Sequence, residues 1–346
     1  MDMQETTYTL PAEWELQKGI QLTWPHRHTD WHDILEEAFA CYLSLAEEIA
    51  SREPLLIVTT AEEKLRQLLK QELSEKAFAN TTLISCRTND TWARDHGVIS
   101  LKDGNGHICV KDFCFNGWGL KFAANFDNQI NRVLYKQGVF EGCRFVNCKD
   151  FVLEGGSIES DGAGTIMTTS QCLLAPNRND TLTQKDIEKR LKDEFGAKKI
   201  LWLNHGNLVG DDTDGHIDTI ARFCPGNIIV YCKETNEEDE QYEDLCAMEE
   251  QLKLFTNAEG KPYSLTPLPV PDPVYYQGER LPATYANFLI MNNAVLYPTY
   301  SQPTKDKQAK EILQTVFPGY EIVGVECSTL IIQHGSLHCA TMQFPR

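Results

Sequence analysis

Residues 33–73, DILEEAFACYLSLAEEIASREPLLIVTTAEEKLRQLLKQEL, contain the alternation that decides the fold class. Apolar residues recur at helical spacing over 33–51 and again over 61–73, with charged residues between them. Between the two predicted helices, Pro54 introduces the apolar run LLIVTT, which predicts a short buried strand. A helix, a strand and a second helix in quick succession predict an α/β or α+β protein.

The same alternation continues along the rest of the chain. Further helices are expected at 127–137, 182–195, 237–253 and 304–317, with N-caps at Thr183 and Thr304 and a stop at Pro318-Gly319. Strands are expected at 81–85, as a pair within 97–113, and at 198–203, 219–223, 227–232, 287–293, 293–298 and 328–333. Because Gly and Pro are not pooled in a linker, residues 1–346 are expected to form a single domain.

The charge balance narrows the choice of partners. The chain has 32 Lys and Arg against 50 Asp and Glu, a net charge of −18 at pH 7. Such a surface repels nucleic acids and anionic membranes and attracts cations. The stretch at 1–19 lacks the features of a signal peptide, and no segment is apolar enough for a membrane helix. We expect a cytoplasmic protein that binds a small cation, and we leave open whether several copies assemble.

Twelve cysteines are present, but their spacing does not indicate a metal site. There is no CxxC pair, and Cys109/Cys114 and Cys143/Cys148 are spaced too loosely for a zinc knuckle. Most of the thiols are therefore expected to be reduced and structural, with Cys339 as the exception.

Two loops place a carboxylate beside glycines. In TWARDHG (91–97), Asp95 can accept paired hydrogen bonds from a planar guanidinium, and Trp92 can stack on such a cation. The alternative for this loop is a structural ion pair between Arg94 and Asp95. In VLEGGS (152–157), two glycines allow close ligand approach, so Glu154 is expected to face an interior cavity. The alternative is a tight turn with Glu154 facing solvent.

Two further stretches carry the groups best suited to proton transfer and nucleophilic attack. In DTDGHIDT (212–219), an extended backbone would point His216 and Asp218 to the same side, with Ile217 in the core behind them. This acidic loop also resembles a metal loop, but it lacks the twelve-residue pattern of a calcium hand, and a plain acidic turn is the other alternative. In IIQHGSLHCAT (331–341), His334, Gly335 and His338 are expected to give Cys339 the electropositive surroundings of a reactive thiolate.

In chain order these motifs read W-x-R-D-x-G, E-G-G, D-G-H-x-D and a C-terminal H-C. This order and spacing resembles the agmatine deiminases, within the wider group that includes bacterial peptidyl-arginine deiminase. The resemblance covers nearly the whole chain. It includes PAEWELQKGIQLTWP near the start, FNGWG at 115–119, SQCLLAPNRN at 170–179 and GERLPATYANFLIMNN at 278–293.

The resemblance implies a fold, a reaction and a set of roles. The fold is a five-bladed α/β propeller of ββαβ units, or pentein. The reaction converts agmatine to N-carbamoylputrescine and ammonia, a step of putrescine and polyamine biosynthesis, through a covalent thiouronium and without a metal or other cofactor. Cys339 matches the nucleophile, His216 the general acid and base, Asp95 and Asp218 the carboxylates that hold the guanidinium, and Glu154 an orienting carboxylate. Trp92 and Trp118 are expected to line the substrate site, and Asp212 and Asp214 to bind the distal ammonium.

One departure from the family pattern bears on the substrate. The family usually reads G-G-G-x-I-H-C, whereas Gln333 and His334 here replace two of the glycines. Deimination of peptidyl-arginine, free arginine or methylated arginine therefore stays open as an alternative. A non-catalytic ribosome-binding propeller would lack Cys339 and His216, and a papain-like hydrolase would place its Cys before its His.

Overall fold

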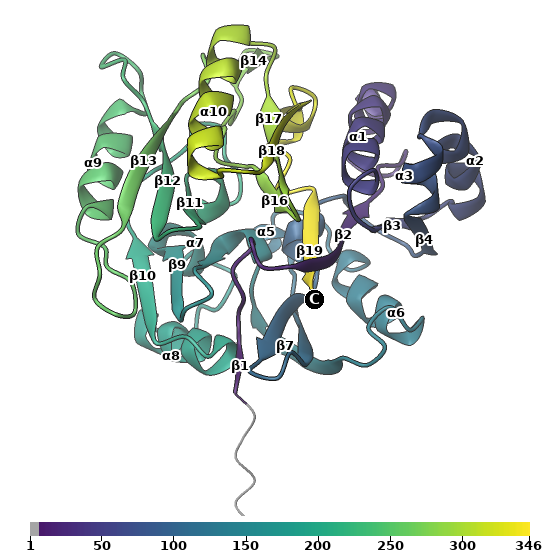
Figure 1. Ribbon diagram of the computed structural model, residues 1–346, viewed down its shortest axis with the longest axis horizontal. Coiled ribbons are helices and arrows are strands. Elements are labelled where there is room, and N and C mark those ends of the chain that lie inside the picture. The colour runs from purple at the N-terminus through teal and green to yellow at the C-terminus, as the bar shows by residue number, and fades with distance from the viewer. Residues whose placement is uncertain (1–6) are drawn as a thin grey trace, which may run out of the picture.

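The computed structural model describes residues 7–346 and confirms an α/β fold. Within these residues, five sheets of three or four strands repeat one topology: an antiparallel pair, a helix, and a strand parallel to the second strand of the pair. Figure 1 shows the main helices at the periphery of the molecule, outside the sheets. The repeat is invisible in the sequence, because the units share only their pattern of apolar residues.

Three of the sheets follow one another along the chain. The first contains β5 (Ile99–Asp103), β6 (Ile108–Cys114), α6 (Ile130–Lys136) and β7 (Arg144–Val152), with β1 (Tyr8–Thr9) on its edge. The second contains β8 (Ile158–Ser160), β9 (Thr165–Thr169), α8 (Gln184–Phe195) and β10 (Lys199–Leu203). The third contains β11 (Ala221–Cys224), β12 (Ile228–Lys233), α9 (Tyr242–Leu252) and β13 (Ser264–Pro269).

The last two sheets bring the ends of the chain together. The fourth contains β16 (Leu289–Met291), β17 (Ala294–Thr299), α10 (Pro303–Val316) and β18 (Glu321–Glu326), after the small hairpin of β14 (Tyr275–Tyr276) and β15 (Glu279–Arg280). In the fifth, the C-terminal β19 (Thr341–Pro345) pairs antiparallel with β2 (Gln17–Thr23). It continues with α1 (Leu35–Ala50), β3 (Leu55–Thr59), α2 (Glu62–Glu72), α3 (Glu75–Ala79) and β4 (Thr81–Ser85).

Apolar side chains of helices and strands form the core. Most of the apolar positions expected over 33–51 are buried or partly buried, with Leu45 and Ile49 fully enclosed against the fourth and fifth sheets. Ile217 is also fully buried, as expected. All twelve cysteines are free thiols. Among the described residues, no helix combines the length and the apolar composition needed to cross a membrane.

Two local predictions were wrong. Residues 328–333 do not form a strand, because Leu330–Gln333 close into the 3-10 helix η5. Thr304 is not an N-cap, because α10 begins one residue earlier, with Pro303 in its first turn and Gln302 at the cap. The stop at Pro318 was correct, since α10 ends at Val316. Thr183 is an N-cap and forms a reciprocal capping box with Asp186.

We predict that Thr183→Ala lowers the free energy of unfolding by about 1 kcal/mol, because the first turn of α8 loses a side-chain acceptor. Urea denaturation followed by circular dichroism measures this change. Thr304→Ala is the matched control. Thr304 is exposed within α10, so the same substitution there should leave stability unchanged or slightly higher. Equal destabilisation by the two changes would contradict the assignment.

Candidate active site

Four short segments at the ends of strands converge on one point. They are α4 (Ala93–His96), η3 (Gly155–Ser157), η4 (Ile217–Thr219) and the turn between η5 and β19. Their convergence is closest at Gly156: a Cβ there would lie 2.6 Å from His216 Nδ1, 2.9 Å from Asp95 Oδ1 and 3.2 Å from Asp218 Oδ2. Only a residue without a side chain fits between these three groups, which accounts for the second glycine of VLEGGS.

A narrow pocket, here called the front cleft, opens onto this point. Its lining includes Asp30, Asp90, Trp92, Asp95, Trp118, Asp212, His334 and Cys339. Five of these were selected from the sequence: Trp92, Asp95, Trp118, Asp212 and Cys339. No Lys or Arg side chain lines the front cleft among the described residues. The cleft is therefore acidic with aromatic walls, which suits a cation with a flat head.

Asp95 is held in place by two donors. Trp118 Nε1 donates to Asp95 Oδ2 at 2.9 Å, and the Gly156 backbone N–H donates to Oδ1 at 3.0 Å. Burial raises the pKa of Asp95 to about 6. The alternative of an Arg94–Asp95 ion pair is wrong, because the Arg94 guanidinium turns away and its Nε lies 3.4 Å from the carbonyl oxygen of His338.

His216 lies fully buried beside Asp95, with 3.6 Å between Nδ1 and Oδ1. Burial opposes its protonation, but Asp95 and the neighbouring Cys172 thiol raise the pKa of His216 well above its usual value. The backbone is not extended here as expected, since Ile217–Thr219 form a 3-10 turn. His216 and Asp218 nevertheless approach the same point, because this turn brings both side chains round to Gly156.

Asp218 divides its two carboxylate oxygens between separate tasks. Oδ2 receives a hydrogen bond from His338 Nδ1 at 2.6 Å, whereas Oδ1 is buried without a partner among the described residues. Although burial opposes it, His338 lowers the pKa of Asp218. The free oxygen of an ionised, fully buried carboxylate is a strong acceptor for an incoming N–H group.

Cys339 lies at the floor of the front cleft and is fixed by Asn287. The Asn287 Oδ1 accepts from the Cys339 backbone N–H at 3.2 Å, and its Nδ2 donates to Sγ at 3.3 Å. Asp218 Oδ2 lies 3.8 Å from Sγ. The expectation of electropositive surroundings was wrong, because burial and the charges of Asp218 and Asp95 raise the pKa of the thiol well above its usual value.

Glu154 is neither exposed nor part of the lining of the front cleft. It is fully buried behind the site, where Arg178 Nε lies 3.0 Å and 3.2 Å from its two oxygens. The same guanidinium binds Asp214 Oδ2 at 2.6 Å, and Lys121 binds Asp214 Oδ1 at 2.8 Å. Asp214 therefore anchors a cationic cluster and does not line the front cleft, whereas Asp212 does.

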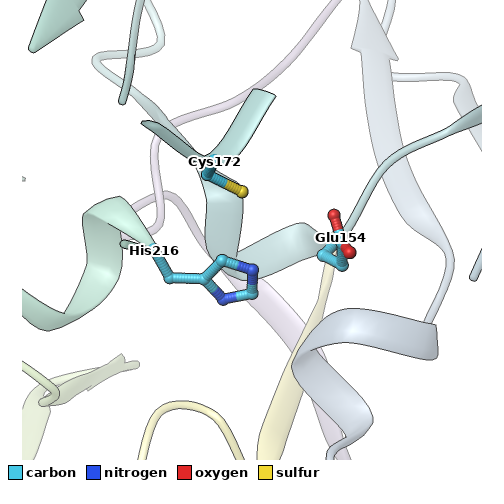
Figure 2. Close-up of side chains that lie close together, drawn as sticks. All are labelled: Glu154, Cys172 and His216. Atoms are coloured by element: carbon cyan, nitrogen blue, oxygen red, sulfur yellow. The ribbon is translucent and has the colours of Figure 1, made fainter. Parts of the chain in front are cut away.

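Cys172 is a buried thiol that the sequence did not single out. Figure 2 shows its thiol close to the imidazole of His216, with the carboxylate of Glu154 next to both groups. Their ligand atoms lie within 4.8 Å of one another, close enough to share a metal ion. Arg178 already neutralises Glu154, however, so a divalent cation there would meet a guanidinium. Glu13, Glu159 and His338 form a similar group, which Arg222 already neutralises.

Gln333 and His334 avoid blocking the cleft. His334 adopts a left-handed backbone with φ of 63°, and its Nδ1 lies 2.7 Å from the carbonyl oxygen of Gly210, to which it donates. Gln333, which also lines the cleft, donates to the backbone oxygen of Asp30. The imidazole thus forms part of the cleft wall and leaves the floor at Cys339 open.

Sequence reasoning missed Arg178, Asn287 and the role of His338. The first two lie in the stretches PNRN (176–179) and ANFLIMNN (286–293), which carried the resemblance without a role for either residue. Their contacts reach residues 24 to 120 positions away, so no local pattern reveals them.

The chain is similar to known proteins over nearly its whole length. The model of the family described as Porphyromonas-type peptidyl-arginine deiminase matches residues 9–345. A Porphyromonas gingivalis protein provisionally named arginine deiminase is 46% identical, with a TM-score of 0.92 over 98% of this chain and 99% of that one. A cysteine-to-serine variant of C. jejuni agmatine deiminase with substrate bound is 37% identical. Its TM-score is 0.91 over 100% of this chain and 98% of that one. A Shewanella baltica (strain OS185) protein provisionally named agmatine deiminase is 34% identical over 98% of this chain and 94% of its own.

We predict that Cys339 reacts slowly with iodoacetamide at pH 7.5 and that Asp218→Asn accelerates the reaction at least about threefold. Removing the carboxylate lowers the thiol pKa, and each unit changes the thiolate fraction about tenfold. Peptide mass spectrometry follows alkylation of Cys339, with the partly exposed Cys246 as internal control. A slower reaction in Asp218→Asn, at an unchanged Cys246 rate, would contradict the role given to Asp218.

Proposed function

Because the chain belongs to the Porphyromonas-type peptidyl-arginine deiminase family, we propose that it hydrolyses agmatine to N-carbamoylputrescine and ammonia. The observation that carries the proposal is the position of Cys339 beneath an acidic, tryptophan-walled cleft, with Sγ 3.8 Å from Asp218. A thiol between buried carboxylates is a poor nucleophile until a cation enters. A guanidinium both supplies that cation and presents the carbon to be attacked.

In the first half-reaction, Asp95 and the free oxygen of Asp218 hold the guanidinium plane through paired hydrogen bonds. The bound cation offsets both carboxylates, so the thiol pKa falls and Sγ can attack the central carbon. The thiol proton passes by way of His216 to one nitrogen. The C–N bond then breaks, ammonia leaves, and a thiouronium remains on Cys339.

In the second half-reaction, water adds to the thiouronium carbon and gives a proton to His216. The C–S bond breaks with its electron pair on Sγ, and the ureido product departs. His216 then gives that proton to the Cys339 thiolate. The remaining proton, which the substrate cation carried, is released and is taken up by the ammonia. In each step His216 accepts a proton and then passes it on, and Asp95 stabilises the protonated form between the two transfers.

The mouth of the front cleft favours agmatine. Asp30, Asp90 and Asp212 line the cleft, and within residues 7–346 no Lys or Arg lines it to receive an α-carboxylate, so a distal ammonium is the better match. Of the two candidates, Asp212 and Asp214, Asp212 stays the residue proposed to bind the ammonium, because it lines the cleft. Free arginine is the second candidate, favoured by His334 on the cleft wall and by the name of the P. gingivalis relative.

We also propose that the five ββαβ sheets are the blades of one propeller. The pairing of C-terminal β19 with N-terminal β2 supports closure of a ring, and the four active-site segments come from different units. A role in polyamine synthesis follows from the proposed product. The expected cytoplasmic location stays a prediction.

We predict that Cys339→Ser binds agmatine but loses at least about 10²-fold in turnover, because a hydroxyl is far less acidic than a thiol. Ammonia and ureido product are measured for agmatine, arginine, methylated arginine and an arginine peptide. Wild type should prefer agmatine. Activity on none of the four would refute deimination. A serine variant that keeps a tenth of wild-type activity would exclude Cys339 as nucleophile.

We predict that Asp212→Asn narrows the kcat/KM ratio of agmatine over arginine at least about tenfold, since an amide cannot neutralise the ammonium. Asp214→Asn is the matched control, and it should leave the ratio unchanged. Burial raises the pKa of Asp212 to about 6. Its carboxylate is protonated below that pH, so the wild-type ratio should rise as pH increases through about 6. A larger effect from Asp214→Asn would return the assignment to that residue.

We predict that Gly156→Ala reduces kcat/KM at least about 10²-fold in a protein that still folds. Its Cβ would push apart His216, Asp95 and Asp218, and displacement by about 1 Å has a cost of this size. Gly104→Ala is the control, because a Cβ there meets nothing within 4 Å. Kinetics and melting curves for the two variants test the convergence of the three side chains, and near-normal activity in Gly156→Ala would contradict it.

A further inference from the structure

A second cavity lies behind the candidate active site. This rear cavity is lined by residues of β5, β8 and β19 and by the N-terminal segment, among them Glu13, Ser100 and Gln343. Its volume is about 60 Å³. One water needs about 10–15 Å³, so the cavity can hold a small cluster of waters.

Four polar atoms on residues that line the rear cavity are buried without a partner among the described residues. They are Gln17 Oε1, Arg94 Nη2, Ser100 Oγ and Gln343 Oε1. Gln17, Arg94 and Ser100 are 5%, 4% and 6% exposed. Buried polar groups rarely lack partners in native proteins, because leaving them unsatisfied is costly. Acceptors and donors are mixed on this wall, and water is the ligand that serves both.

The wall of the rear cavity is also the back wall of the active site. Arg94, Gly155 and His338 line the cavity, and each directly precedes a residue at the point of convergence: Asp95, Gly156 and Cys339. His338 Nδ1 lies 2.6 Å from Asp218 Oδ2, and that oxygen lies 3.8 Å from Cys339 Sγ. Two contacts therefore separate the rear cavity from the nucleophile.

Arg94 is the loosest part of this wall. Its Nε lies 3.4 Å from the His338 carbonyl oxygen, and its Nη1 lies 3.7 Å from the sulfur of Met342. It forms no ion pair within the described part of the chain, and burial lowers the pKa of its guanidinium. Its Nη2 has no partner among the described residues, so it is available to bind a water on the cavity side.

We propose that the rear cavity is a water-binding site and that it supplies the water that hydrolyses the Cys339 adduct. The proposal rests on the proposed deimination. After ammonia leaves, the rest of the substrate stays attached to Sγ and fills the front cleft. Water from the rear cavity then forms the new C–O bond and gives a proton to His216, while the C–S bond breaks and its electron pair returns to Sγ.

The test separates the two half-reactions in Ser100→Leu, which fills the rear cavity and removes one polar atom. Rapid mixing with agmatine, acid quenching and intact mass measurement give the ammonia burst and the lifetime of the adduct. We expect the burst rate to stay within about twofold and hydrolysis of the adduct to slow at least about tenfold, so that adduct accumulates. Ser100 also borders a neighbouring apolar cavity, so Thr82→Leu, which fills only that neighbouring cavity, is the control and should match wild type.

A second variant guards against misfolding of Ser100→Leu. Gln343→Met keeps the side-chain length and removes an unpartnered acceptor, so its adduct should also hydrolyse more slowly, by at least about threefold. Wild-type hydrolysis rates in the folded variants, or equal slowing of burst and hydrolysis, would overturn the rear water site. A wild type that forms neither ammonia nor adduct from any guanidino compound would instead refute deimination itself.

Discussion

The hydrogen bond between His338 and Asp218 is the contact on which the rest of the active site depends. It occupies one oxygen of a fully buried carboxylate and leaves the other free for a ligand. His338 is held in turn by Glu13, 2.8 Å from its Nε2, and Glu13 pairs with Arg222. Arg222 pairs with Glu159 as well, so one cluster of buried charges ties the N-terminal segment to β8, β11 and the Cys339 turn. Pairing of this kind offsets part of the cost of burying charges.

In the proposed mechanism, this arrangement controls when the thiol becomes reactive. Burial, together with Asp218 and Asp95, raises the pKa of Cys339 well above its usual value, which favours the protonated thiol in an empty site. The same two carboxylates have the geometry to bind a planar cation. Under the proposed function, binding and activation are therefore one event, and a neutral or anionic compound in the front cleft would gain neither. The acidic surface of the whole chain acts in the same direction by attracting cations.

Local patterns in the sequence predicted the helices well and the strands unevenly. The amphipathic stretch 182–195 became α8 with its cap at Thr183, because capping and periodicity are local properties. In contrast, the strands that were not predicted include β2, β7, β8, β9, β13, β18 and β19. Three of these, β7, β13 and β18, are the last parallel strands of their sheets and pair with a partner across a helix, as when Ser264 of β13 aligns with Ile228. Pairing across such distances leaves little trace in a short window of sequence, particularly where prolines interrupt it, as in SLTPLP.

The active site shows the same division between local and distant information. Motifs correctly indicated which segments meet, because glycines and polar groups at strand ends mark such places. They did not indicate which carboxylates were already engaged. Asp214 and Asp212 are equivalent in the sequence. In the structure, however, Arg178 and Lys121 form ion pairs with Asp214, whereas Asp212 lines the cleft. The surroundings of Cys339 were misjudged for the same reason, since His338 faces Asp218 while the carboxylates face the thiol.

His334 occupies a position at which the family pattern has a glycine. A left-handed backbone is unfavourable for a residue with a side chain, and here the bond to Gly210 offsets part of that cost. Residues held in such conformations are concentrated at functional sites. His334 contributes to the wall near Asp212, whereas Asp95 and Cys339 line the floor, where Asp95 meets Asp218 and His216 around Gly156. Under the proposed function, the floor binds the guanidinium group, which all these substrates have. The mouth contacts the opposite end of the substrate, where they differ. A change at position 334 can therefore alter the preferred substrate while the groups that carry out deimination stay intact.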